Sequence, residues 1–147
     1  MLGAVALPDA GTARERPVPD DRIGPGWSQM RKDLVLVGPA ADPAHVSGMR
    51  DAAEALRRIA AARAPFVSRG DRGDAHQAEL RLWRAARVEP LTGRGDWYRE
   101  VIRGGAAALE AAAAQDAYTL AERRDWLSLR ERRNLRVVVE GDWRLSD

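Results

Sequence analysis

The chain has 147 residues, of which 45% are hydrophobic and 31% charged, a composition typical of one packed domain or one lobe of a two-lobed protein. A net charge of only +2, with arginines mixed among acidic residues, argues against nucleic-acid binding, and the lack of cysteine excludes disulfides and thiolate metal sites. No apolar run approaches the ~20 residues of a membrane span, and the N-terminus lacks the basic start of a signal peptide.

The first predicted element follows a segment of different character. Residues 1–31 contain prolines, glycines and scattered charges, and are typical of a variable tail or a loosely docked arm. Residues 32–147 are predicted to form the structured lobe. Within it, residues 34–37 are a β-branched apolar run, which predicts a buried strand stopped by Gly38 and Pro39.

Two helices and a strand are predicted next. Ser47 is the expected N-cap of a helix whose apolar residues recur at helical spacing, and this helix should end before Pro65. Residues 66–68 predict a brief strand. A Gly-containing turn leads from it into a second helix, so that backbone N–H groups and the positive end of the helix converge where an anion can sit. The apolar residues of this helix are Leu80, Leu82, Trp83 and Ala86.

The second half of the lobe continues the alternation of strands and helices. The expected elements are a loop at 88–96, an Ala-rich helix at 106–114, a strand at 117–120, a helix at 122–132 with Trp126, Leu127 and Leu129 facing inward, and a strand at 135–139. Strands that alternate with helices predict an α/β fold with a mainly parallel sheet flanked by helices.

A series of short motifs keeps its order and spacing over roughly residues 33–145. In these motifs the chain resembles the tungstate/molybdate-type substrate-binding proteins of ABC transporters, within the periplasmic binding protein class. The turn Ser68-Arg69-Gly70-Asp71 with His76 is the most informative of them. The others are Asp33 to Pro39, Asp42-Pro43, Gly48-Met49, Ala60 to Val67, Glu79-Leu80, Leu82-Trp83, Trp97-Tyr98, Ala117 to Leu120, Arg123, Trp126-Leu127 and Val139 to Asp142.

The resemblance implies a lobe of a two-lobed α/β protein that closes on a tetrahedral oxyanion such as tungstate or molybdate. It implies an extracytoplasmic location, an ABC transporter permease as partner, and neither enzymatic activity nor a cofactor or protein-bound metal. Family members carry a further N-terminal lobe with a Thr/Ser-rich oxyanion loop, and that lobe has no counterpart in this sequence. The chain is therefore expected to be a single periplasmic-binding-protein-like lobe.

The same resemblance implies the ligand-binding residues. Arg69 would offer a planar charged donor fork to the oxyanion, Ser68 a hydroxyl, and Asp71 would orient the arginine, with Gly70 in the turn between them. The alternative is that Arg69 is an ordinary surface arginine at the end of a strand.

The second part of the motif departs from the family, in which Ser-Gly-Thr follows. Gly73, Asp74 and Ala75 stand at these positions, so both hydroxyl donors are absent and a carboxylate lies near the helix start. A simpler interpretation makes Asp74 the N-cap of the helix, paired with Gln77, so that the carboxylate occupies the place of the substrate.

Several other residues are expected to be structural. His76 and Tyr118 are predicted to pack rather than to bind ligand, the separated tryptophans to serve the core or its rim, and Gly104-Gly105 to break the chain before the Ala-rich helix.

Two functions remain open from the sequence. The first is an oxyanion-binding lobe with weakened or lost affinity. The second is a truncated or split remnant that acts as a structural or interaction module, either by self-association or by pairing with a separately encoded missing lobe.

Overall fold

The computed structural model of the chain describes residues 33–146, and the tail predicted at 1–31 lies outside the described residues. Most of the predicted elements are present. In chain order they are β1 (Leu34–Pro39), α2 (Ala52–Ala62), β2 (Phe66–Ser68), α3 (Asp74–Ala86), a 3-10 helix (Pro90–Gly93), β3 (Tyr98–Glu100), α4 (Gly105–Gln115), β4 (Tyr118–Glu122), α5 (Arg123–Ser128), β5 (Leu135–Val139) and a second 3-10 helix (Trp143–Leu145).

The strands form one five-stranded mixed sheet in the order β3-β2-β4-β1-β5. β2 pairs in parallel with both β3 and β4, whereas β1 is antiparallel to its neighbours β4 and β5. Four strands therefore share one direction, and β1 runs against them. The predicted α/β class with helices on a sheet is confirmed, with one reversed strand inside the sheet.

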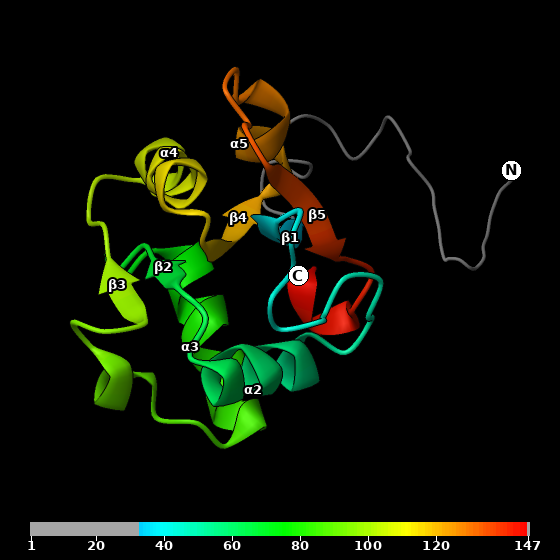
Figure 1. The fold of residues 1–147 in the computed structure, drawn as a ribbon, viewed down its shortest axis with the longest axis vertical. Helices are drawn as coiled ribbons and strands as arrows, with labels where there is room; N and C mark the ends of the chain where they lie inside the picture. The colour runs from blue at the N-terminus through cyan, green and yellow to red at the C-terminus, as the bar shows by residue number, and fades with distance from the viewer. Residues whose placement is uncertain (1–32, 147) are drawn as a thin grey trace, which may run out of the picture. The chain divides into compact units, whose positions relative to one another are not determined.

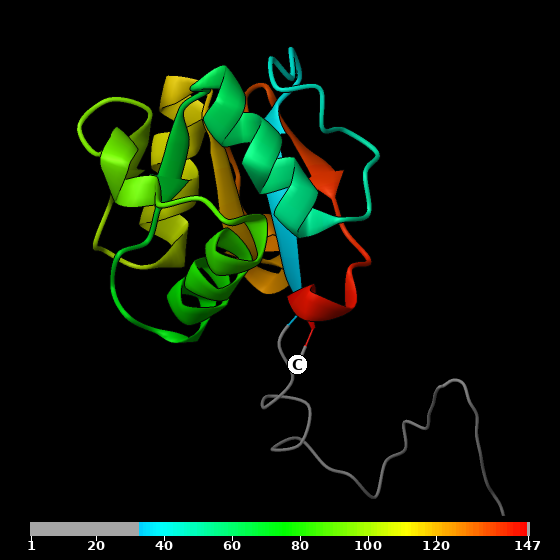
Figure 2. The same ribbon diagram turned by 90° about the horizontal axis from the view of Figure 1, so that it is seen from below.

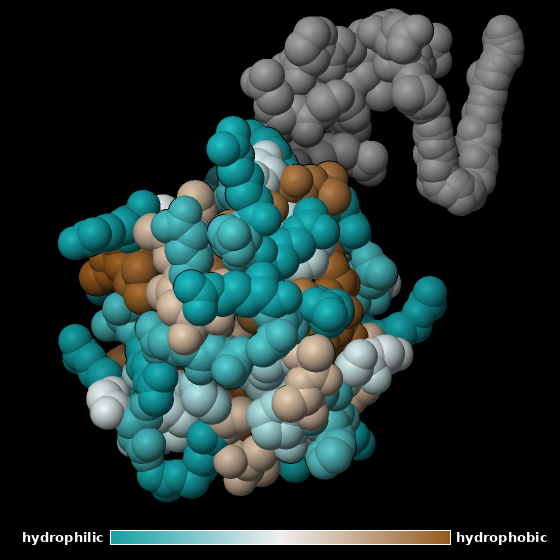
Figure 3. Space-filling model, turned by 45° about the horizontal axis from the view of Figure 1, so that its top comes forward, coloured by the Kyte–Doolittle hydropathy of each residue, from teal (hydrophilic) through white to brown (hydrophobic). Residues whose placement is uncertain are grey.

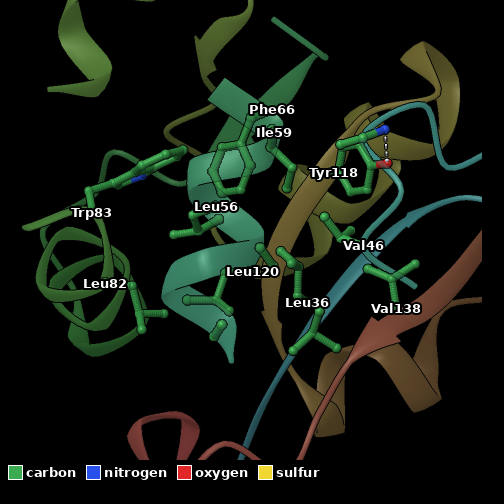
Figure 4. Close-up of a cluster of buried hydrophobic side chains, with 14 of the residues drawn as sticks. Leu36, Val46, Leu56, Ile59, Phe66, Leu82, Trp83, Tyr118, Leu120 and Val138 are labelled. Carbon is green, nitrogen blue, oxygen red and sulfur yellow. Dashed lines mark hydrogen bonds between the residues drawn. The ribbon is translucent and has the colours of Figure 1, made fainter. Parts of the chain in front are cut away.

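Helices cover both faces of the sheet, as Figures 1 and 2 show. Alternate residues of β1 enter opposite hydrophobic clusters, as the period of a strand requires. Leu34 and Leu36 pack with residues of α2 and α3, and Val35 and Val37 pack with residues of α4 and α5. Figure 4 shows the first of these clusters. The lobe is thus a helix–sheet–helix sandwich with a core on each side of the sheet.

The strand β1 is longer than predicted, because it includes Gly38 and Pro39. Gly38 pairs with Arg136 in β5, and a β-carbon at this position would overlap the ring of Tyr118. Glycine therefore lets the aromatic ring pack directly against the strand backbone. The prediction that Gly38-Pro39 stops the strand was wrong because it treated as a breaker a glycine that packing requires.

The N-cap of α2 is Asp51, not Ser47. The Asp51 side chain accepts a hydrogen bond from the Glu54 N–H, and the helix begins at Ala52. The backbone N–H of Ser47 instead donates to the carboxylate of Asp42 at 2.8 Å, so Ser47 belongs to the preceding loop. The helix ends at Ala62, before Pro65 as predicted.

Two further elements differ from the prediction. β3 lies just beyond the predicted loop at 88–96, and its three residues are too few to give a periodic signal. α5 ends at Ser128, and Leu127, expected inside, is 65% exposed. Trp126 is buried as expected, and the Arg132 guanidinium lies 4.2 Å from its ring centroid. The helix therefore offers only one large anchor to the core.

Candidate functional site

The turn between β2 and α3 is held by hydrogen bonds that it makes to itself. Gly70 and Arg72 adopt positive φ angles of 61° and 65°. The Gly70 N–H donates to Ser68 Oγ at 3.2 Å, the Arg72 N–H to His76 Nδ1 at 2.9 Å, and the Gly73 N–H to Asp71 Oδ1 at 2.9 Å. The sequence predicted a group of free amides here, and this is wrong for these N–H groups. An anion bound near this turn would have to use donors other than these three amides.

Arg69 extends from this turn into an acidic environment. Its Nε and Nη2 atoms donate to Asp71 Oδ2 at 3.2 and 3.0 Å, and its Nη1 lies 3.6 Å from Glu122 Oε2 at the end of β4. The side chain is 15% exposed, against 22% for Asp71 and 20% for Glu122. The expectation that Asp71 orients Arg69 agrees with this geometry. The guanidinium is a charged donor held in a fixed direction by two carboxylates.

The same guanidinium lies beside the first turn of α4. A β-carbon at Gly105 would overlap the carboxylate of Asp125 in α5 and would lie 3.4 Å from Arg69 Nη1. Gly104 precedes the helix with a φ of 97° and provides no side-chain cap. Gly104-Gly105 was predicted as a structural break. The structure adds that the lack of a side chain at Gly105 lets Arg69 and Asp125 come close to the start of α4.

Ser68 is fully buried, because it points to the same side of β2 as Phe66, toward α3. Its hydroxyl donates to Glu79 Oε1 at 2.8 Å while its oxygen accepts the Gly70 N–H. Glu79 Oε2 also accepts from Trp83 Nε1 at 2.9 Å and from the Tyr98 hydroxyl at 2.5 Å. The hydroxyl proposed for an oxyanion thus serves a buried network behind the turn.

Glu79 was not predicted as part of the site, although the sequence held a signal for it. It lies on the apolar face of α3, in line with Leu82 and Trp83, where a carboxylate is unexpected. Glu122 and Asp125, in contrast, come from distant parts of the chain, and no local pattern marks them as neighbours of Arg69.

Burial raises the pKa of Glu79 to about 6, despite the hydrogen bonds from Tyr98, Trp83 and Ser68, which act in the opposite direction. A carboxyl with a raised pKa binds its proton more tightly in the folded state. Its contribution to stability is complete below its ordinary pKa of 4.5 and is lost as the pH rises through about 6. We expect the free energy of unfolding, relative to that of Glu79→Gln, to fall by about 2 kcal/mol between roughly pH 4 and 8.

Urea denaturation of both proteins across this pH range would measure that difference. Parallel stability curves for the two proteins would contradict the prediction. The pKa of Asp71 is shifted in the opposite direction. Partial burial raises it, but the hydrogen bond from the Gly73 N–H and the Arg69 guanidinium together lower it by more, so the pKa lies below the usual value.

Asp74 is not the N-cap of α3. Gly73 holds that position with extended backbone, and Asp74 is the first helical residue. The Gln77 N–H donates to the carbonyl of Gly73 at 2.9 Å, which is the first intrahelical hydrogen bond of α3. Asp74 is exposed and Ala75 is buried. A carboxylate in the first turn still favours the helix dipole, so this residue helps α3 while adding negative charge beside Arg69's turn.

Most of the residues expected to be structural lie in the packed interior, but Trp143, expected at the core or its rim, is 80% exposed, and Trp27 lies outside the described residues. His76 is buried and accepts the Arg72 N–H, and Tyr118 donates to Asp42 Oδ1 at 2.5 Å and accepts the Ala44 N–H at 3.1 Å. Trp83 and Trp126 are buried. Residues 33–146 hold no group of His, Cys, Asp and Glu suited to a metal ion. No helix within that range is both long and apolar enough to cross a bilayer.

The fold and turn together define a class: a lobe of the periplasmic-binding-protein type whose β2–α3 turn carries an oriented arginine. No protein-family profile matches the chain. A proposed ABC transporter anion-binding protein of Haloferax volcanii is 45% identical over 112 residues, which are 76% of this chain and 32% of that protein. The tungstate-binding protein TupA of Peptoclostridium acidaminophilum is 36% identical over 118 residues, which are 79% of this chain and 40% of the relative.

A solved structure supports the same relationship. The tungstate-binding protein TupA of Desulfovibrio alaskensis superposes with a TM-score of 0.71 and 36% identity, covering 79% of this chain and 47% of that one. The resemblance inferred from the sequence is confirmed: the chain is a homologue of tungstate-type binding proteins of ABC transporters. It spans 32% to 47% of the length of these relatives.

Proposed function

We propose that this chain is an oxyanion-binding lobe of an ABC-transporter substrate-binding protein, with an affinity for tungstate or molybdate lowered by its own carboxylates. It works by binding, not by catalysis, and its partners are a tetrahedral oxyanion and a transporter permease, in an extracytoplasmic compartment. The observation that carries this proposal is the oriented guanidinium of Arg69 at the β2–α3 turn of a lobe homologous to tungstate-binding proteins.

The geometry supports a site formed by Arg69 and the first turn of α3. Gly73, Asp74 and Ala75 lie at the N-cap and start of this 13-residue helix, whose positive end favours an anion; the Gly73 N–H itself is already donated to Asp71 Oδ1, so Gly73 contributes through its backbone conformation. Ser68, Gly70 and Asp71 form the supporting side of the site, because they bond to one another and to Arg69. Of the residues implied by the resemblance, Arg69 and the start of α3 would thus meet the anion, and Ser68, Gly70 and Asp71 would hold them in position.

The lowered affinity follows from the charges that surround Arg69. Asp71 and Glu122 already pair with it, and an incoming oxyanion must share the guanidinium with both. Two like charges about 4 Å apart repel by roughly 4 kcal/mol at an effective dielectric constant near 20. The hydroxyl donors missing at Gly73 and Ala75 remove about 1 kcal/mol or more each.

Calorimetric titration of the whole chain with tungstate, molybdate, sulfate and phosphate tests this proposal. We expect a tungstate dissociation constant weaker than about 1 μM, equivalent to less than roughly 8 kcal/mol of binding free energy. Arg69→Ala should abolish the binding. Glu122→Gln should strengthen it about tenfold, since it removes a charge 3.6 Å from Arg69 Nη1 and preserves the side-chain shape.

Glu54→Gln is the matched control for Glu122→Gln, because Glu54 pairs with Arg57 and Arg58 on the surface of α2. It should leave the titration unchanged. Sub-micromolar tungstate binding by the unmodified protein, unaffected by Glu122→Gln, would contradict the lowered affinity. No heat with any of the four anions at millimolar concentration would contradict oxyanion binding itself.

The alternative function is an interaction module that binds no small molecule, either self-associated or paired with a separately encoded lobe. One observation favours it: Ile102 is 62% exposed and lies next to Gly70, since a β-carbon on that glycine would be 3.2 Å from Ile102 Cγ1. The face in Figure 3 is mostly hydrophilic, with its apolar surface in separate areas rather than one broad patch. A monomeric species by light scattering would count against self-association.

A further inference from the structure

Glu79 is a buried carboxylate held by neutral donors. It is 3% exposed, and its two oxygens accept hydrogen bonds from Ser68, Trp83 and Tyr98. Within residues 33–146 no arginine, lysine or histidine forms an ion pair with it. A buried charge without a cationic partner is costly, and a carboxyl at this place in the core requires an explanation beyond packing.

The hydrogen bonds of Ser68 connect Glu79 to the turn. The Ser68 hydroxyl donates to Glu79 Oε1 at 2.8 Å, which fixes the rotation of the hydroxyl and directs a lone pair of its oxygen toward the Gly70 N–H, 3.2 Å away. Gly70 follows Arg69 directly and has a positive φ angle of 61°, so its backbone sets the direction in which the arginine leaves the turn.

We propose that Glu79 is a positioning residue for this turn: by accepting the Ser68 hydroxyl proton it fixes the Ser68–Gly70 hydrogen bond and the backbone that carries Arg69. The significance of the turn as an anion site rests on the proposed function. The ordering of the turn by Glu79 does not.

The donor arrangement favours the ionised form locally, in the turn, although burial makes this form less favourable for the stability of the lobe as a whole. Ser68 approaches one oxygen of Glu79, and Trp83 and Tyr98 approach the other, so each oxygen must accept. A protonated carboxyl or a glutamine presents a donor toward at least one of these groups, which leaves a buried N–H or O–H without an acceptor. The other charged or titratable groups that act on Glu79 are the phenol of Tyr98 and the carboxylate of Glu100, both in β3.

Amide hydrogen exchange of Gly70, measured by NMR on the whole chain, tests the proposal. Glu79→Gln and Ser68→Ala should each speed the exchange of the Gly70 amide at least tenfold at pH 8. The double variant should exchange no faster than the faster single variant, because both changes break the same connection. In the unmodified protein, protection of Gly70 should decrease as the pH falls through about 6, where Glu79 takes up its proton.

Thr119→Val is the matched control. Thr119 is a buried hydroxyl in β4 that donates to the carbonyl of Val67 in the same strand as Ser68, at 2.7 Å. Its loss removes a hydrogen bond as buried as that of Ser68, but it leaves the connection from Glu79 through Ser68 to Gly70 intact. Exchange of Gly70 should therefore stay within about threefold of the unmodified protein, which separates a specific effect on the turn from a general loss of stability.

Unchanged Gly70 exchange in Glu79→Gln, or effects of Glu79→Gln and Ser68→Ala that multiply in the double variant, would overturn the proposal. If Glu79→Gln does not fold, the pH dependence of Gly70 protection in the unmodified protein decides, and a flat profile between pH 5 and 8 overturns it. Tungstate titration of the same samples keeps the two proposals separate. If Gly70 exchanges as expected but tungstate does not bind, only the proposed oxyanion-binding function is contradicted. If tungstate binds but Gly70 does not exchange as expected, only the role of Glu79 is contradicted.

Discussion

Replacing Trp83 by alanine is expected to lower the free energy of unfolding by about 3–5 kcal/mol, the range for truncating a large buried aromatic residue. Trp83 is 1% exposed, and its ring centroid lies 5.3 Å from that of Phe66, 5.7 Å from Trp97 and 6.0 Å from Tyr98. The change would leave a cavity between α3 and the sheet. It would also remove the Nε1 donor of Glu79, 2.9 Å away, so a buried carboxylate loses one of its hydrogen bonds.

Trp143→Ala provides the comparison, because it removes the same side chain from a surface site that is 80% exposed. Urea denaturation should show a change within about 0.5 kcal/mol for this variant. Should the two alanine variants lose similar stability, the aromatic cluster around Trp83 would not be the anchor of this core.

Gly38→Ala is expected to cost about 3 kcal/mol, a large effect for adding one methyl group. The new β-carbon would overlap the ring of Tyr118, which has no exposed surface. Displacing the ring would also weaken the bonds of its hydroxyl to Asp42 Oδ1, at 2.5 Å, and to the Ala44 N–H, at 3.1 Å. The loop between β1 and α2 would lose one of its attachments to the sheet, leaving those of Gly48 and Met49 to β5.

A double-mutant cycle separates this steric effect from the loss of glycine itself. In a Tyr118→Leu background, which removes the ring, Gly38→Ala should change the free energy of unfolding by less than about 1 kcal/mol. An equal cost in both backgrounds would show that the close approach of Tyr118 is not what requires glycine at this position.

Much of the fold follows from local patterns. The apolar runs of β1 and β5 and the helical spacing in α2 and α3 were visible in the sequence, because burial on one face imposes a period on the residues. The reversed direction of β1 was not, since strand pairing depends on contacts between distant segments. Leu36, for instance, pairs with both Leu120 and Val139.

The candidate site divides in the same way. The contact of Arg69 with Asp71 is local and was expected, whereas that with Glu122 joins the ends of two separate strands and carries no sequence signal. Ser68 was expected to face the ligand. The alternation of side chains along β2 places it instead on the side of the sheet that α3 covers, where its hydroxyl donates a hydrogen bond to Glu79.

We propose that an oxyanion binds at Arg69 and the first turn of α3. The most direct measurement is a tungstate titration of the ¹⁵N-labelled chain followed by NMR. It should shift the backbone amides of Asp74 and Ala75 and the Nε–H of Arg69, with a single dissociation constant, and Arg69→Ala should remove all three shifts. Resonances that stay in place up to millimolar tungstate, or that move only in another part of the lobe, would contradict the claim.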